Sequence, residues 1–187
     1  MAGLREAILS GDPVPAGLVP ESNGPKAWWE IMHHNPKQIT SDVQLLQATG
    51  VPRIDPEQLQ HVAVMNPESL FIHPSAKIGA MTVFDCTLGP ILIEEGVEVM
   101  PMTTIIGPVV VGRGSLIKVG SKIYSGTTIG PVSKVGGEVE NSIIQGYSNK
   151  QHDGYLGHSF LGEWVNLGAG TNTSDLRNDY GTISVTI

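Results

Sequence analysis

The sequence predicts an all-β fold in which most of the chain winds into a parallel β-helix behind an N-terminal helical arm. Across residues 93–135, every sixth position is isoleucine or valine, and the residue two places before most of them is small or β-branched. A helix cannot keep a six-residue period on one face, and an ordinary antiparallel strand has a period of two. A period of six is typical of β-helices built from hexapeptides.

In such a coil each hexapeptide is a short strand that ends at a corner. The aliphatic residue points inward, the small residue fits the crowded corner, and three hexapeptides close one turn. The inward positions are Ile93, Val99, Ile105, Val111, Ile117, Ile123, Ile129 and Val135. Their small companions are Val97, Thr103, Val109, Ser115, Ser121, Thr127 and Ser133. Eight consecutive matches make a β-sandwich with accidental spacing an inferior explanation.

The first 70 residues follow a different pattern and hold eight of the 13 prolines. We expect short helices at LREAIL, at AWWEIMHH until Pro36 ends it, and from Thr40 or Ser41 to Gly50. His33 and His34 have no Cys or acidic partner at ligand spacing, so we predict no metal site there. The predicted division is a helical, proline-rich arm or linker over 1–70 and a β-helix over 71–187.

Composition excludes several classes of protein. The net charge is −7 and the 11 Lys and Arg form no basic run, which argues against a nucleic-acid partner. No stretch approaches the roughly 20 apolar residues of a membrane span. The single cysteine, Cys86, rules out an internal disulfide and is expected in the core. A cytoplasmic protein with no membrane partner is the prediction.

The last residues, GTISVTI, have the composition of a strand that continues into another coil. Because repeat coils need a cap at each end, we expect the sequence to be a piece of a longer protein, truncated at the C-terminal end of its β-helix.

The aliphatic repeat breaks at SNKQHDGYLG, residues 148–157. Its polar, turn-prone residues are unsuited to an apolar interior, so we expect a loop that leaves the coil or an outer wall. His152 exchanges protons readily near neutral pH, and Asp153, Glu138 or Asp175 could orient its ring. Taken alone, this spacing favours an ordinary solvated histidine.

Two motifs change that interpretation. HDGYLG at 152–157 and VNLGAGT at 165–171 resemble the acetyltransferase domain of the bifunctional N-acetylglucosamine-1-phosphate uridyltransferase and glucosamine-1-phosphate acetyltransferase family. Residues from about 25 to 187 resemble more closely a related group of sugar-nucleotidyltransferase proteins, in which a nucleotidyltransferase domain precedes a helical linker and a β-helix. The resemblance implies a left-handed β-helix and a homotrimer. The expected outward position of Trp164 is a second reason to expect the homotrimer.

The resemblance also implies residue roles. His152 would be the general base that deprotonates a sugar amine before it attacks the thioester of acetyl-CoA. Tyr155 would contact the sugar or its phosphate, and Asn166 would hydrogen-bond the sugar. Lys118 stands where the family has an arginine. The acceptor would be an amino-sugar phosphate or a nucleotide sugar.

Two positions depart from the family pattern. The family's phosphate-binding lysine falls near Gly136, so Lys134 or Lys150 would have to substitute for it. A family asparagine beside the acetyl group corresponds to Asp175, which adds a negative charge. These departures keep two alternatives open: a non-catalytic oligomerising or regulatory β-helix of a sugar-1-phosphate nucleotidyltransferase, and a purely structural scaffold.

Overall fold

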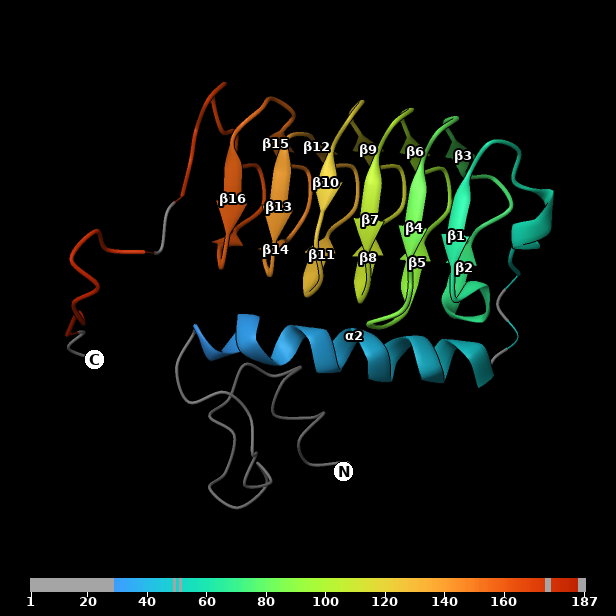
Figure 1. The fold of residues 1–187 in the computed structure, drawn as a ribbon, viewed down its shortest axis with the longest axis horizontal. Helices are drawn as coiled ribbons and strands as arrows, with labels where there is room; N and C mark the ends of the chain where they lie inside the picture. The colour runs from blue at the N-terminus through green and yellow to red at the C-terminus, as the bar shows by residue number, and fades with distance from the viewer. Residues whose placement is uncertain (1–28, 49, 51, 174–175, 185–187) are drawn as a thin grey trace, which may run out of the picture.

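The computed structural model describes residues 29–48, 50, 52–173 and 176–184, and these form one long helix beside a β-solenoid of about six turns (Figure 1). The solenoid is a left-handed parallel β-helix: the repeat predicted the parallel β-helix, and the resemblance implied its left hand. Each turn contributes one strand to each of three parallel sheets, which we call sheets A, B and C in the order in which the chain visits them.

Sheet A contains β1 (Ala63–Met65), β4 (Val83–Asp85), β7 (Thr104–Ile106), β10 (Lys122–Ile123), β13 (Glu138–Glu140) and β16 (Tyr155–Gly157). Sheet B contains β2 (Leu70–Ile72), β5 (Ile91–Ile93), β8 (Val109–Val111), β11 (Thr127–Ile129), β14 (Ile143–Ile144) and β17 (Phe160–Leu161). Sheet C contains β3 (Lys77–Ile78), β6 (Glu98–Val99), β9 (Leu116–Ile117), β12 (Lys134–Val135) and β15 (Asn149–Lys150). Two 3₁₀ helices, η1 (Pro56–Gln58) and η2 (Pro67–Ser69), flank β1, which begins before residue 71, where the repeat pattern placed the start of the β-helix.

The predicted interior is confirmed. All eight repeat positions and all seven companion positions are at most 1% exposed. Each inward side chain lies directly above its counterpart in the next turn, because parallel pairing joins Ile105 to Ile123 and Val99 to Ile117. Cys86 is also in this core, where burial raises the pKa of its thiol to about 12 and keeps it unreactive.

A single helix, α2 (Glu30–Ala48), replaces the two helices that Pro36 was expected to separate. Pro36 lies inside α2 and removes one amide donor from the helix. Thr40, expected to cap a new helix, instead donates from its Oγ1 to the carbonyl of Pro36 at 3.0 Å. The prediction was wrong because it considered local propensity without tertiary packing.

That packing is against the outer face of sheet B (Figure 1). Ile39 and Val43 bury themselves on Phe71, Leu92 and Val110, the outward residues of three successive strands. A polar contact fixes the other half of α2. Asn35 donates from Nδ2 to the carbonyl of Gly126 at 2.7 Å and accepts from Thr128 Oγ1 at 3.0 Å. These contacts hold the helix continuous across its proline. The expected helix at LREAIL lies outside the described residues.

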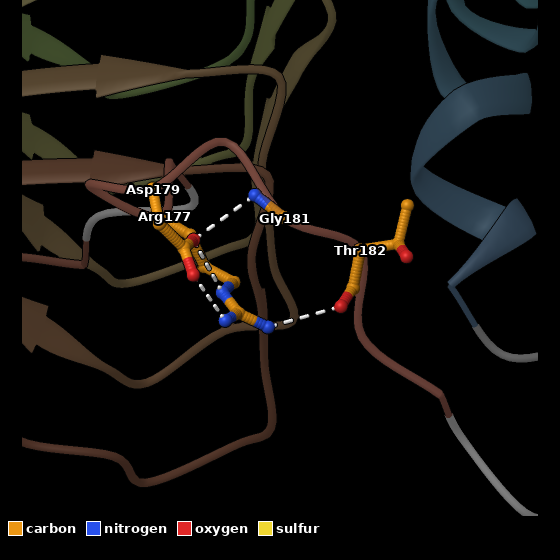
Figure 2. A network of polar contacts seen from close by, with 4 residues as sticks. All are labelled: Arg177, Asp179, Gly181 and Thr182. Carbon is orange, nitrogen blue, oxygen red and sulfur yellow. Dashed lines mark hydrogen bonds and ion pairs between the residues drawn. The ribbon is translucent and has the colours of Figure 1, made fainter.

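The strand expected at GTISVTI does not form over residues 181–184. Arg177 instead organises a local turn (Figure 2). Its guanidinium donates to both carboxylate oxygens of Asp179, at 2.9 and 2.6 Å, and to the carbonyl of Thr182 at 2.9 Å. This turn lies away from the solenoid, so its backbone pairs with no sheet (Figure 1).

The chain changes direction at corners where one residue adopts a left-handed backbone conformation. Between sheets C and A this residue is Gly120 in one turn and Gly137 in the next, with φ of +68° and +73°. A Cβ on Gly120 would meet no atom within 4 Å, whereas a Cβ on Gly137 would lie 2.8 Å from the carbonyl oxygen of Gly154 and 3.0 Å from that of His152. The second corner is therefore closely packed.

We expect Ile117→Asp to prevent folding. Ile117 is fully buried between Val99 and Val135, so a carboxylate there would lose its water without gaining a partner, at a cost of several kcal/mol. Circular dichroism should show no cooperative thermal transition. Val119→Asp, a similar change at a half-exposed position, is the control and should melt like the wild type. A soluble Ile117→Asp protein with an unchanged melting temperature would contradict the fold.

We expect Gly137→Ala to destabilise the protein more than Gly120→Ala. Both substitutions place a Cβ on a left-handed residue, which costs about 1–2 kcal/mol. Only the first also displaces backbone carbonyls, which should add about 1–3 kcal/mol. Urea denaturation followed by circular dichroism measures both free energies. Equal losses would show that the corner at Gly137 is not crowded.

Candidate functional site

The segment that interrupts the aliphatic repeat stays in the solenoid, contrary to the expected loop or outer wall. Asn149–Lys150 form β15 and Tyr155–Gly157 form β16, and both pair in register with the preceding turn. The pairing joins Val135 to Lys150 across fifteen residues, whereas Ile117 pairs with Val135 across eighteen. The turn is shorter, and residues 151–154 form only the corner between sheets C and A.

Polar residues occupy interior positions in this turn. Ser148 and Lys150 are each 3% exposed. Ser148 Oγ lies 2.9 Å from the carbonyl oxygen of Gly146 and 3.0 Å from that of Gly162. Ser148 thus takes the small corner position that Ser133 takes one turn earlier, and Lys150 takes the aliphatic position of Val135. Hydrogen bonds from Lys150 to corner carbonyls keep this turn in the solenoid, and the prediction of a loop was wrong because it did not consider them.

Lys150 takes the place in sheet C that Val135 takes one turn earlier. Its Nζ donates to the carbonyl of Gly136 at 2.8 Å and to the carbonyl of His152 at 2.8 Å. Burial lowers the pKa of the Lys150 ammonium, and the charge of Asp153 opposes that shift. The ammonium therefore faces the backbone of the corner from inside.

His152 lies at the outside of the same corner and its side chain is exposed. Its Nε2 is 3.4 Å from the side-chain nitrogen of Gln151, and Asp153 beside it is also exposed. Glu138, one expected orienting group, forms a 3.5 Å ion pair with Lys122. Asp175, the other, lies outside the described residues.

Tyr155 is half-buried on the sheet A side of this corner. Its hydroxyl donates to Glu140 Oε2 at 3.0 Å, and its amide donates to Asn172 Oδ1 at 2.7 Å. A groove of about 340 Å³ lies beside it. The lining residues are Gly120, Lys122, Gly137, Glu138, Asp153, Gly154, Tyr155 and Asn172.

Lys122 and Asn172 were missed by the sequence analysis. The register pairs Lys122 with Glu138 and Glu138 with Tyr155, and the bridge from Leu156 to Thr173 continues it to Asn172. Lys122 and Asn172 therefore belong to one outward row of sheet A. Counting turn lengths across the interruption would have found that row.

The other candidates lie at the corner or on sheet C. Lys118 is half-buried, and its Cβ lies 3.1 Å from where a Cβ on Gly136 would stand. Lys134 is exposed and pairs in register with Asn149, which donates to Asn166 Oδ1 at 2.8 Å. Asn166 is exposed. The structure thus places Lys118 and His152 at one corner, with Tyr155 on one flanking face and Lys134 and Asn166 on the other.

In the part of the chain that the structure describes, no three His, Cys, Asp or Glu side chains gather closely enough to hold a metal ion. Within the same ranges, no helix has the length and apolar character to cross a membrane.

Curated proteins called "Bifunctional protein GlmU" are similar to this chain, although no protein-family model matches it. The protein from Heliobacterium modesticaldum is 33% identical over 159 residues, which are 72% of this chain and 34% of the relative. The protein from Synechococcus elongatus is 29% identical over 192 residues, 92% of this chain and 41% of the relative. The chain spans about a third to two fifths of the length of the curated relatives it matches.

The similarity covers most of this chain, and the solenoid has the inward aliphatic repeat that the hexapeptide pattern predicted. The resemblance inferred from HDGYLG and VNLGAGT is therefore confirmed. The chain is a homologue of the GlmU proteins, and its β-solenoid fits their hexapeptide-repeat acetyltransferase domain.

Proposed function

We propose that this solenoid transfers an acetyl group from acetyl-CoA to the amine of an amino-sugar phosphate or nucleotide sugar, with His152 as general base. The observation that carries the proposal is the corner between sheets C and A. It presents the exposed His152 beside Tyr155 on one face and Asn166 on the other. The similarity to GlmU proteins supports the same class of reaction.

His152 acts by accepting a proton from the sugar amine as the nitrogen attacks the thioester carbonyl. The C–N bond forms, the C–S bond breaks, and the proton passes from the imidazolium to the departing thiolate of CoA. No covalent intermediate with the enzyme is needed. The exposed ring of His152 is free of core packing, so it can lie against a bound sugar.

We assign the substrate's phosphate to Lys118 and Lys134. Both lysines lie near the C–A corner, and neither side chain is buried. Lys150 differs, because its ammonium already donates to two carbonyls inside the coil. Lysine binds phosphate as a point charge rather than through a bidentate fork, so the acceptor is held less rigidly than by the family's arginine. Asp175 remains a proposed contact on the strength of the resemblance.

We propose that the active assembly is a homotrimer with the acyl sites between neighbouring solenoids. Trp164 is 76% exposed and stacks on Tyr147, with ring centroids 5.0 Å apart. Val132 lies at the same corner one turn before Tyr147 and is 54% exposed. An apolar row of this kind is typical of surfaces that pack against another protein. A cytoplasmic location suits the free thiol of Cys86.

A second candidate is a non-catalytic, oligomerising or regulatory β-helix of a sugar-1-phosphate nucleotidyltransferase. The inward ammonium of Lys150 and the absence of a side chain at Gly136 favour it, because both remove cations from the outer surface of the corner. An acetyl-transfer assay distinguishes the two candidates.

We expect His152→Ala to reduce acetyl transfer by roughly 10²- to 10⁴-fold, the range typical of losing a general base. Release of the CoA thiol, with glucosamine 1-phosphate and other amino sugars as acceptors, measures the rate. The melting temperature should stay within about 2 °C, because the exposed ring fills no core space. His158→Ala, at the next exposed histidine, should keep the wild-type rate. Full activity in His152→Ala would exclude this mechanism.

We expect sedimentation velocity to show a trimer at roughly tens of micromolar, a concentration at which mass action favours association. Trp164→Asn should shift the population toward monomer, since asparagine tolerates the left-handed backbone but removes the apolar surface. Tyr180→Asn alters an equally exposed, left-handed aromatic away from the solenoid and should leave the trimer intact. A wild-type monomer at this concentration would contradict the proposal.

A further inference from the structure

Lys150 departs from the rule that governs the solenoid's interior. The inward residues of sheet C are Ile78, Val99, Ile117 and Val135 in the four preceding turns, and then Lys150. A buried ammonium is costly unless hydrogen bonds replace its water. An aliphatic residue would therefore satisfy the packing at this position more simply, and the lysine calls for another explanation.

The bonds of Lys150 identify what the ammonium holds. Its two carbonyl acceptors belong to Gly136, in the previous turn, and to His152, in its own turn. Both acceptors lie at the C–A corner. The lysine stem fills the aliphatic stack while its head links the backbones of two successive turns.

The surrounding backbone is shaped to receive this head. A Cβ on Gly137 would lie 3.0 Å from Lys150 Nζ, 3.0 Å from the carbonyl oxygen of His152 and 2.8 Å from that of Gly154. A Cβ on Gly136 would overlap the carbonyl of Gln151. The glycine pair therefore leaves room for an ammonium and for the carbonyls of the following turn.

The geometry points to Lys150 as a positioning residue for His152. Its ammonium fixes the His152 carbonyl to the inside of the corner, which leaves the imidazole of the same residue on the outside, where a ligand can reach it. Asp153, next to His152 in the same corner, is exposed. The inference rests on the proposed function only for its effect on rate, because the bonds themselves belong to the fold.

Three measurements test this role. Lys150→Met keeps the length and apolar stem of the side chain but removes the ammonium. It should fold with a melting temperature equal to or above that of the wild type, since replacing a buried charge by an apolar group of similar volume is often neutral or stabilising. With acetyl-CoA and glucosamine 1-phosphate, kcat should fall roughly 10- to 100-fold while both KM values stay within about twofold, because a displaced catalytic group costs rate rather than affinity.

The third measurement does not use activity. In protein labelled with ¹³C-histidine, Lys150→Met should move the NMR ring signals of His152 and leave those of His73 unchanged. Lys77→Met removes an exposed lysine from the first strand of the same sheet and should change none of the three readouts. If Lys150→Met does not fold, Lys150→Leu, which also removes the donor but has a shorter apolar side chain, replaces it in the same measurements.

Each outcome supports or overturns the positioning role. An unchanged kcat overturns it. A raised KM for the sugar phosphate with an unchanged kcat also overturns it and would make Lys150 a substrate contact. If the wild type transfers no acetyl group, the proposed function fails while the NMR arm still decides this inference. Unmoved His152 signals in a folded Lys150→Met protein then overturn it.

Discussion

The fold depends on one constraint: the hydrogen bonds between parallel strands of successive turns keep every inward side chain directly above its counterpart. Ile105 lies over Ile123 and Val99 over Ile117 because the backbone register allows no other arrangement without turning apolar groups outward. Helix α2 follows from the same constraint, since the register also aligns Phe71, Leu92 and Val110 into an apolar stripe on sheet B. That stripe stabilises the helix strongly enough to retain Pro36 inside it.

The candidate site is a local use of this constraint. At the C–A corner the strands continue in register, but the turn contracts and the inward position is taken by Lys150 instead of an aliphatic residue. The interior and the outer surface are thereby joined through one backbone segment. His152, the proposed general base, presents its side chain on the outside, while Lys150 donates to its carbonyl from the inside.

The sequence was sufficient for the solenoid and its core, because a sixfold repeat of Ile and Val has few other physical explanations. It also singled out His152, Tyr155 and Asn166 through two short motifs. It was insufficient where tertiary contacts decide the outcome. Neither the passage of α2 through Pro36 nor the inward direction of Lys150 follows from local propensity, since one depends on a stripe assembled from distant strands and the other on carbonyls of two different turns. The turn at Arg177 likewise depends on side-chain bonds that composition does not reveal.

The contracted turn between Val135 and Lys150 has an evolutionary consequence. The distance along the solenoid axis between two turns is fixed by backbone hydrogen bonding at roughly 4.8 Å, but the length of chain used to go around each turn is not. Residues can thus be deleted or inserted at a corner while the stacked interior keeps its order. A lineage that carries this fold can alter the outline of the surface around His152 in single-residue steps, and the altered chain still closes on the same core.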